Sequence, residues 1–279
     1  MSSKSKIEKM IKLFRSREMI PIPKLMNSQK LLEGKVALIT GGSGGIGFAI
    51  AKAFLEHGCK VIIAGTNEKK LRNCEEQLKE YGKFCDYIIL DVLDVKSMTE
   101  KIWGAAAKFP EDKIDILVNS AGLNGQKNFE NMTEEEYDAI MDVNVKGTYF
   151  MSQIVGQLMI EKKIKGHILN IASSSSLRPA STPYCISKWA VRGMTLGLAD
   201  VLLPYGIVVN AIAPGSVVTP MLGKKEGDPI DNPNAICGRY AVPQEIASLA
   251  VFMVSDLGNL IVGDTYFITG GSGLISLHH

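Results

Sequence analysis

The chain has 279 residues, of which 46% are apolar and 22% charged, and its formal net charge at pH 7 is +2. This composition is typical of a soluble globular protein and excludes a disordered or fibrous chain. No run of about 18 uninterrupted apolar residues occurs, and no apolar signal-peptide core precedes the first domain. We therefore expect a cytoplasmic protein with no membrane span.

The cysteines and histidines argue against a disulfide framework and against a metal site. The five cysteines are an odd number and form no Cys-x-x-Cys pair, and only four histidines are present. A reducing compartment fits this pattern, and we expect no bound metal. Residues 33–279 have a net charge of −4, which argues against nucleic-acid binding by the body of the protein.

Residues 1–33 differ from the rest of the chain and form a predicted basic arm and linker. Ile7, Met10, Ile11 and Phe14 recur at helical spacing with basic residues between them, which predicts a short amphipathic helix. Prolines at 21 and 23 then end the helix. Packing on its own subunit or on a neighbouring subunit is the favoured interpretation, and a membrane-surface or partner-binding helix is the alternative.

From residue 34 onward, short apolar runs alternate with helical segments. Such runs indicate a parallel sheet that helices cover on both faces, in which ligands bind at the carboxyl ends of the strands. We predict a single α/β domain over residues 34–279, a doubly wound Rossmann-type fold with about seven strands and a short substrate lid at about 221–238. The expected strands are 36–39, 61–64, 87–90, 114–118, 168–171, 207–212 and 266–269, and the expected helices include 45–57, 69–81, 134–162, 184–203 and 243–255.

A glycine-rich run, Thr40-Gly41-Gly42-Ser43-Gly44-Gly45-Ile46-Gly47, follows the first strand and opens a helix. Glycines at this position let the backbone approach a pyrophosphate, which the helix N-terminus then binds. An acid that would bind the ribose of NAD is absent at the end of the second strand, where Gly65-Thr66-Asn67 stands. Because nothing acidic opposes a 2′-phosphate there, NADP(H) is slightly favoured over NAD(H). An arginine placed to meet the 2′-phosphate is also missing, and the basic residues at 69, 70 and 72 stand at a helix start, where solvated cations are common.

Tyr184 and Lys188 lie four residues apart at the start of a predicted helix, and this spacing places them on one face. A phenol has a pKa near 10, which a neighbouring ammonium group lowers. The pair could therefore act as a general acid or base. The pattern gains weight from its place after the fifth strand of a sheet that opens with a glycine loop.

With these motifs the chain resembles the short-chain dehydrogenase/reductase family, in its compact one-domain subtype, from about residue 32 to residue 274. The matching pieces occur in the order of the family: Thr40-Gly41-x-x-x-Gly45-x-Gly47, Asn119-Ser120-Ala121-Gly122, Asn144, the serine run from Ser173, Tyr184-x-x-x-Lys188, and Pro214-Gly215 with Thr219. The resemblance implies an NAD(P)-dependent oxidoreductase that interconverts a secondary alcohol and a ketone. It also implies a homodimer or homotetramer built on the 134–162 and 184–203 helices.

The resemblance also implies roles for individual residues. Tyr184 would exchange a proton with the substrate oxygen, Ser173 would hydrogen-bond that oxygen, and Lys188 would lower the pKa of the tyrosine and bind the nicotinamide ribose. Asn144 would hold a water that links Lys188 to solvent. The implied cofactor-binding residues are Gly41, Ser43, Gly44, Gly45, Ile46, Gly47, Thr66, Asp91, Val92, Asn119, Ala121, Gly122, Tyr184, Lys188, Pro214, Gly215, Val217 and Thr219.

Two departures from the family pattern leave alternatives open. Ser173 precedes Tyr184 by 11 residues, a shorter interval than is usual in the family, and Ser174 is the alternative to Ser173. The lid is flanked by Lys224, Lys225 and Arg239, which could attract an anionic substrate, although solvated surface charges are the simpler interpretation.

The sequence leaves the substrate open. Its pocket walls are expected from residues 123–127, 177–183 and 217–238. A sugar acid or polyol is the first candidate, because the sequence around Phe48 and the short lid are similar to those of gluconate-type dehydrogenases. A 3-oxoacyl thioester, a steroid or another cyclic ketone is the alternative, and so is a nucleotide-binding scaffold without turnover.

Overall fold

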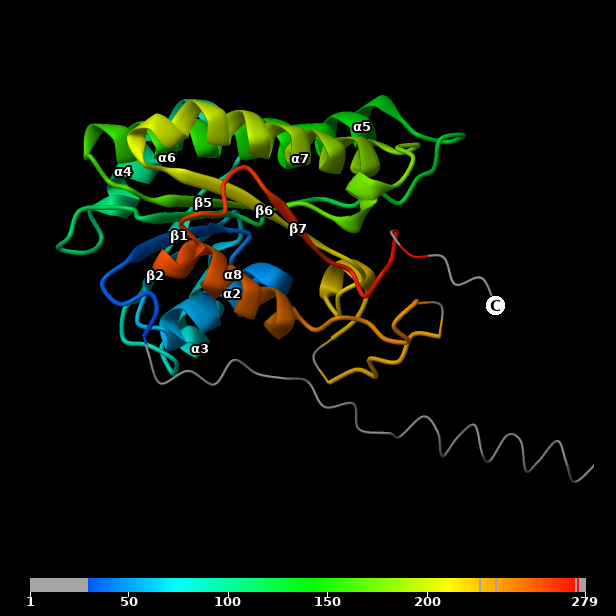
Figure 1. The fold of residues 1–279 in the computed structure, drawn as a ribbon, viewed down its shortest axis with the longest axis horizontal. Helices are drawn as coiled ribbons and strands as arrows, with labels where there is room; N and C mark the ends of the chain where they lie inside the picture. The colour runs from blue at the N-terminus through cyan, green and yellow to red at the C-terminus, as the bar shows by residue number, and fades with distance from the viewer. Residues whose placement is uncertain (1–29, 226, 234, 274, 276–279) are drawn as a thin grey trace, which may run out of the picture.

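Seven parallel strands form one central sheet (Figure 1). The computed structural model describes residues 30–225, 227–233, 235–273 and 275, so the expected N-terminal helix lies outside the described residues. The strand order is β3-β2-β1-β4-β5-β6-β7, and every neighbouring pair is parallel. The bounds are β1 (Val36–Thr40), β2 (Lys60–Gly65), β3 (Cys85–Ile89), β4 (Ile116–Asn119), β5 (His167–Ile171), β6 (Val208–Pro214) and β7 (Thr265–Ile268).

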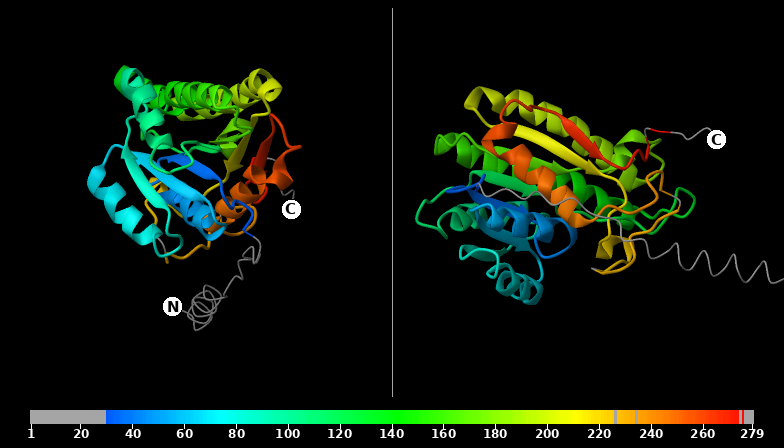
Figure 2. Two further views of the ribbon diagram at one scale, coloured as in Figure 1. Left: turned by 90° about the vertical axis from the view of Figure 1, so that its left-hand side faces the viewer. Right: turned by 60° about the horizontal axis from the view of Figure 1, so that its bottom comes forward.

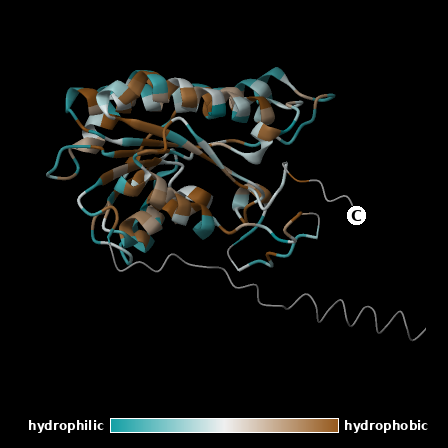
Figure 3. Ribbon diagram, viewed as in Figure 1, coloured by the Kyte–Doolittle hydropathy of each residue, from teal (hydrophilic) through white to brown (hydrophobic). Residues whose placement is uncertain are grey.

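Helices cover both faces of the sheet (Figure 2). Successive residues of one strand pack in opposite helical layers. In β1, Ala37 and Ile39 pack in the core that holds α2 (Gly45–Glu56), α3 (Glu68–Leu78) and α8 (Pro243–Val254). Val36 and Leu38 pack in the other core, with α4 (Val95–Ala106), α6 (Thr148–Glu161) and α7 (Pro183–Leu202). Figure 3 shows the apolar strands between these layers. The predicted doubly wound sheet is confirmed.

The helix expected over 134–162 is interrupted at the position of a candidate catalytic residue. It consists of α5 (Glu134–Met141), a π-helical segment η1 (Asp142–Gly147) and α6, and Asn144 lies in the π-helical segment. A π-helical turn accommodates an extra residue in a helix, and such turns are frequent at functional sites. The apolar periodicity of the sequence continues through this segment, so it predicted one uninterrupted helix.

The segments at the two ends of the described domain pack in different ways. Leu32 is fully buried, and its amide donates to the His57 carbonyl at 3.0 Å, so contacts with the domain begin before residue 34. Near the other end, the expected lid contains the short 3-10 helix η4 (Pro220–Leu222) and turns, and its described residues form no α-helix. No helix in the described part of the chain combines the length and apolarity needed to cross a bilayer.

The strand order places a cleft between β1 and β4. From β1 the chain proceeds outward to β2 and β3, and then returns to β4 on the other side of β1. The loops that follow β1 and β4 therefore diverge to opposite faces, and ligands in this class of sheet bind where such loops separate.

His167 provides a test of the packing at the amino end of β5. The side chain is 4% exposed, and burial, with a smaller contribution from the charge of Lys35, lowers its pKa to about 4. The unfolded chain binds this proton near pH 6.5 and the folded chain does not, so stability falls as the pH drops from 6.5 to 4. We expect the wild type to lose up to about 3 kcal/mol of unfolding free energy across this range from His167.

Urea denaturation at pH 7 and pH 4.5 measures this loss, and the His167→Gln variant should show a smaller loss between the two pH values. Equal losses in the variant and the wild type would show that His167 is not the titrating group.

Candidate active site

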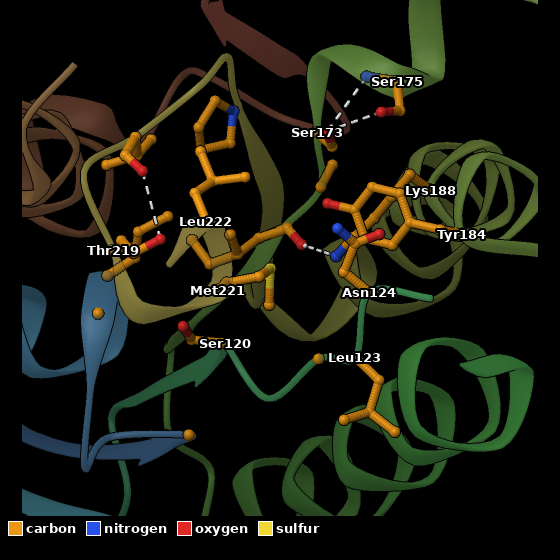
Figure 4. A pocket seen from close by; sticks show the side chains of 18 of the residues that line it. Ser120, Leu123, Asn124, Ser173, Ser175, Tyr184, Lys188, Thr219, Met221 and Leu222 are labelled. Carbon is orange, nitrogen blue, oxygen red and sulfur yellow. Dashed lines mark hydrogen bonds between the residues drawn. The ribbon is translucent and has the colours of Figure 1, made fainter. Parts of the chain in front are cut away.

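A pocket of about 840 Å³ opens at the carboxyl ends of the central strands (Figure 4). The loop after β1, the loop after β4, the segment after β5, the start of α7 and the loop after β6 all contribute to its lining. The pocket therefore lies where the strand order predicts a ligand site. It brings together Gly41, Ser43, Gly44, Gly45, Ile46, Ala121, Gly122, Ser173, Ser174, Tyr184, Lys188, Pro214, Gly215, Val217 and Thr219.

The glycine loop is packed so tightly at Gly41 and Gly47 that neither position has room for a larger residue. A Cβ added to Gly41 would lie 2.9 Å from backbone atoms of Ala121, and one added to Gly47 would lie 2.4 Å from the carbonyl oxygen of Gly41. Thr40 strengthens the same contact, because its hydroxyl accepts from the amides of Ser120 at 3.1 Å and Ala121 at 3.2 Å. The first residues after β1 and β4 are thereby fixed side by side, before the two loops diverge.

The N-terminus of α2 is suited to a phosphate group. Its N-cap is Gly44, no side chain caps the first turn, and the first turn contains no acidic residue. A Cβ added to Gly44 would meet nothing within 4 Å, so the helix end is open toward the pocket. Unpaired N–H groups and the positive end of a helix dipole attract an anion, and this end of the pocket fits the pyrophosphate of a dinucleotide.

Tyr184, Lys188 and Ser173 converge at the other end of the pocket. Figure 4 shows the Tyr184 hydroxyl directed toward Ser173. Lys188 lies on the same face of α7, with its Nζ 5.6 Å from the centre of the Tyr184 ring. Its Nζ also donates to the carbonyl oxygen of Ile171 at 2.9 Å. The expected acid–base group is therefore assembled in one place.

Burial controls the protonation of this pair. Desolvation raises the pKa of Tyr184, and its hydrogen bond with Ser173 opposes that rise. Desolvation lowers the pKa of Lys188 to about 8. Both shifts favour the neutral side chains, whereas the sequence argument expected the lysine to lower the pKa of the tyrosine. In this structure the phenol holds its proton near neutral pH and can donate it to an oxygen atom in the pocket.

Ser173 is better placed than Ser174 for contact with the bound molecule. Its Oγ accepts from the Ser175 amide at 3.1 Å and lies 3.2 Å from the Ser175 hydroxyl. These contacts fix its side chain at the start of the 3-10 helix η2 (Ser174–Leu177). Ser174 also lines the pocket, but Ser173 is the serine toward which the Tyr184 hydroxyl is directed.

Asn144 acts as a clamp behind the pocket. Its Oδ1 accepts from the Leu123 amide at 2.8 Å, and its Nδ2 donates to the Leu123 carbonyl and to the Ser187 hydroxyl, both at 2.9 Å. The Ser187 hydroxyl in turn donates to the Tyr184 carbonyl at 2.7 Å. Both N–H groups of the amide are engaged, so Asn144 connects the loop after β4 to α7. Ser187 was not among the predicted site residues, although its position directly before Lys188 in the helix could have indicated a role.

Asn119, expected to bind the cofactor, points into the core and does not line the pocket. It is buried, and its Nδ2 donates to Ser152 Oγ and to Asn170 Oδ1, both at 2.9 Å. Asn170 continues the network by donating to Thr195 at 3.0 Å. Asn119 is the last residue of β4, and the alternation of the strand directs its side chain toward α6.

Four further residues of the expected cofactor set also lie outside the pocket lining. Asp91 accepts from the Leu93 amide at 2.9 Å, and Val92 is buried beside the π-helical segment, where it contacts Gly147. Thr66 is exposed beyond the end of β2, and Gly47 lies behind the glycine loop. Their expected contacts with a cofactor stay a prediction.

The lid cations also lie away from the pocket. Arg239 forms two hydrogen bonds to Glu245, at 2.7 and 2.8 Å, and Lys224 lies 4.5 Å from the centre of the Tyr240 ring. Of the lid residues that the structure describes, only Met221 and Leu222 reach the pocket lining. The cations that do line it are Lys70, Arg178 and Lys188.

Comparisons with known proteins agree with this geometry. The family model described as short chain dehydrogenase matches residues 35–229. Galactitol 2-dehydrogenase of Agrobacterium fabrum is 36% identical, over 86% of this chain and 98% of that protein. The 3-oxoacyl-acyl-carrier-protein reductase of Thermotoga maritima is 34% identical, over 86% and 98%. The crystal structure of a gluconate 5-dehydrogenase from Burkholderia cenocepacia with NADP and tartrate covers 89% of this chain and 98% of its own, with a TM-score of 0.79 and 29% identity.

The tight glycine loop predicts that Gly47 and Gly44 respond differently to substitution. Gly47→Ala should lower the unfolding free energy by about 1–3 kcal/mol, because the added methyl group overlaps the Gly41 carbonyl. Gly44→Ala is the matched control, since its backbone is extended and its added methyl group meets nothing. Denaturant titration of both variants measures the difference, and equal stability of the two would contradict the packing described here.

Proposed function

The chain belongs to the short-chain dehydrogenase/reductase family of oxidoreductases, and we propose that it interconverts a secondary alcohol and a ketone with NADP(H) in preference to NAD(H). One observation supports this activity above the others: the Tyr184 hydroxyl is directed toward Ser173, and the Lys188 Nζ lies 5.6 Å from the centre of its ring, in the pocket that also holds the glycine loop. A non-catalytic scaffold would not need a buried lysine at this position.

The glycine loop and the α2 N-terminus would hold the pyrophosphate of the cofactor, as their open N–H groups indicate. Gly122, Pro214 to Val217, and Thr219 would line the rest of the dinucleotide, since they share the pocket lining. The bound nicotinamide supplies the hydride chemistry. The protein supplies position and a proton.

In the proposed mechanism Tyr184 moves a proton at the substrate oxygen. During ketone reduction the protonated phenol donates to that oxygen, and during alcohol oxidation the phenolate accepts from it. Ser173 hydrogen-bonds the same oxygen and is itself held by Ser175. Lys188, anchored to the Ile171 carbonyl, stabilises the phenolate when its ammonium group is charged. Asn144 keeps α7 and the loop after β4 in register.

Charge near the end of β2 supports the preference for NADP(H). Lys70 lines the pocket, while Glu68, the nearest acid in the sequence, accepts from Arg72 at 2.9 Å and from the Tyr87 hydroxyl at 3.4 Å. No Asp or Glu occurs among the described residues of the pocket lining. A 2′-phosphate would therefore meet one cation and no carboxylate.

A sugar acid or polyol is the first candidate substrate, and the similarity to a galactitol dehydrogenase and a gluconate dehydrogenase supports this choice. A 3-oxoacyl thioester is the second candidate. Leu123, Met221 and Leu222 line the pocket and remain exposed, which favours an acyl chain at its mouth. Turnover of both classes in parallel distinguishes the two candidates.

Assembly into a homodimer or homotetramer is part of the same proposal. Leu196 and Val201 on α7 are 62% and 63% exposed, and Trp189 on the same helix is also exposed. Gly193 and Gly197 lie among them, and a Cβ added to either would meet nothing within 4 Å. An apolar helix face with small residues allows the close approach of a second helix.

Replacement of the tyrosine tests the mechanism. Tyr184→Phe should lower kcat for NADPH-dependent ketone reduction by at least about a hundredfold, because it removes the transferred proton. The Kd of NADPH, measured by fluorescence, should stay nearly unchanged. Tyr205→Phe is the matched control, since Tyr205 is exposed in η3 (Leu203–Tyr205) and does not line the pocket. Full activity of Tyr184→Phe would exclude the proposed mechanism.

Substitution of Lys70 tests the cofactor preference. Lys70→Gln should raise the Kd of NADPH by about fivefold, the size expected for a partly exposed ion pair, and leave the Kd of NADH unchanged. Lys69→Gln is the control, because Lys69 is exposed and does not line the pocket. Equal effects on both cofactors, or a tighter complex with NADH in the wild type, would refute the preference.

A further inference from the structure

The charged side chains that line the pocket are all positive, and this favours a particular class of substrate within the proposed function. Of the described residues that line it, none is acidic, and three are cationic: Lys70, Arg178 and Lys188. Two of these cations have roles already. Lys70 lies at the start of α3, at the glycine-loop end, and Lys188 is buried beneath Tyr184 and bonded to the Ile171 carbonyl. Arg178 is the cation that remains.

Arg178 lies at the substrate end of the pocket. It is the residue directly after η2, in the segment that runs from Ser173 to Tyr184, and all three residues line the same pocket. Its backbone is fixed, because the Trp189 indole Nε1 donates to the Arg178 carbonyl at 2.9 Å. The reacting groups and this guanidinium are thus presented by one short, anchored stretch of chain.

The guanidinium group has a neutral partner and no carboxylate partner among the described residues. Its Nη2 donates to the hydroxyl of Ser272, in the turns that follow β7. A guanidinium group has five N–H donors, so this bond leaves most of them available. Arg178 is exposed, and no acid occurs among the described residues that line the pocket. Its guanidinium group can therefore bind an anion from solution.

The other basic residues near the lid do not compete for this role. Arg239 is neutralised by Glu245, and Lys224 packs against Tyr240. Neither these two residues nor Lys225 lines the pocket. The sequence suggested that lid cations attract an anionic substrate, but the available cation lies in the segment after β5, at Arg178.

We propose that Arg178, held by Ser272, binds a carboxylate group of the substrate and so selects hydroxy acids and keto acids over neutral polyols. The planar fork of a guanidinium matches a carboxylate in a two-point hydrogen bond, which fixes orientation as well as charge. With the carboxylate at Arg178, the reacting carbon of the substrate would lie toward Ser173 and Tyr184. This inference rests on the proposed function, since it assigns the substrate class of the same site.

The test compares a sugar acid with a matched neutral polyol. We would measure kcat/KM for gluconate and for glucitol, with NADP⁺, in the wild type and in Arg178→Gln, Arg178→Lys and Lys225→Gln. Arg178→Gln should lower kcat/KM for gluconate by about tenfold to a hundredfold, mostly through KM, and change that for glucitol by less than about threefold. Arg178→Lys should recover part of the loss, because it restores charge without the fork.

Lys225→Gln is the matched control, an exposed lid cation outside the pocket, and it should behave as the wild type. Equal losses for gluconate and glucitol in Arg178→Gln, or no loss for gluconate, would overturn the proposal. So would a dependence on Arg178 that appears for glucitol 6-phosphate and not for gluconate.

A binding measurement separates this inference from the proposed function. In Tyr184→Phe and in Tyr184→Phe/Arg178→Gln, calorimetric titration of the NADP⁺ complex with gluconate reports binding without turnover. Gluconate binding that is about tenfold to a hundredfold weaker in the double variant would support the role of Arg178. This holds even if the wild type oxidises no alcohol, which would refute only the proposed activity. Equal binding by both variants would overturn the assignment of Arg178.

Discussion

Burial of the sheet on both faces is the constraint from which the rest of this structure follows. A parallel strand covered by helices on each side is mostly apolar along its length, so charged groups gather mainly where the strands end. In this chain β1, β4, β5 and β6 are buried throughout, and the pocket lies beyond their carboxyl ends. The divergence of the loops after β1 and β4 then opens space for a ligand, and the glycines at 41, 44 and 45 add no side chains to that space.

The side chains of Lys188 and Asn144 are positioned mainly by hydrogen bonds to backbone groups. Lys188 is bonded to the carbonyl of Ile171, at the end of β5, and Asn144 is bonded to both backbone groups of Leu123. Charged and polar side chains that are buried need such partners, since an unpaired one is costly. The cost is visible in Lys188, whose pKa falls to about 8 because burial disfavours its charged form. The carbonyl of Ile171 that accepts its hydrogen bond carries no charge. The site therefore holds a cation that gains from any negative charge formed on Tyr184.

The sequence predicted the elements whose signal is local. The apolar runs located all seven strands to within a few residues, and the glycine loop and the Tyr184–Lys188 spacing located both ends of the pocket. The sequence did not predict where individual side chains point. Asn119 stands at the expected place but faces the core, because strand alternation turns it toward Ser152. The lid cations likewise stand near the pocket in sequence, yet Glu245 neutralises Arg239, and only folding reveals Arg178 at the wall. The π-helical segment left no sign in the apolar periodicity.

That π-helical segment makes the length of the chain as important as its composition. An α-helix turns by about 100° for each residue, so one residue fewer between Thr133 and Lys162 could restore a regular helix while rotating one half against the other. Asn144 would then leave Leu123 and Ser187, although every remaining side chain would be unchanged. Over evolutionary time this stretch should therefore accept many replacements on its exposed side and reject insertions and deletions. The number of residues between α5 and α6 therefore matters to the site as much as their identity, and substitutions alone would not test it.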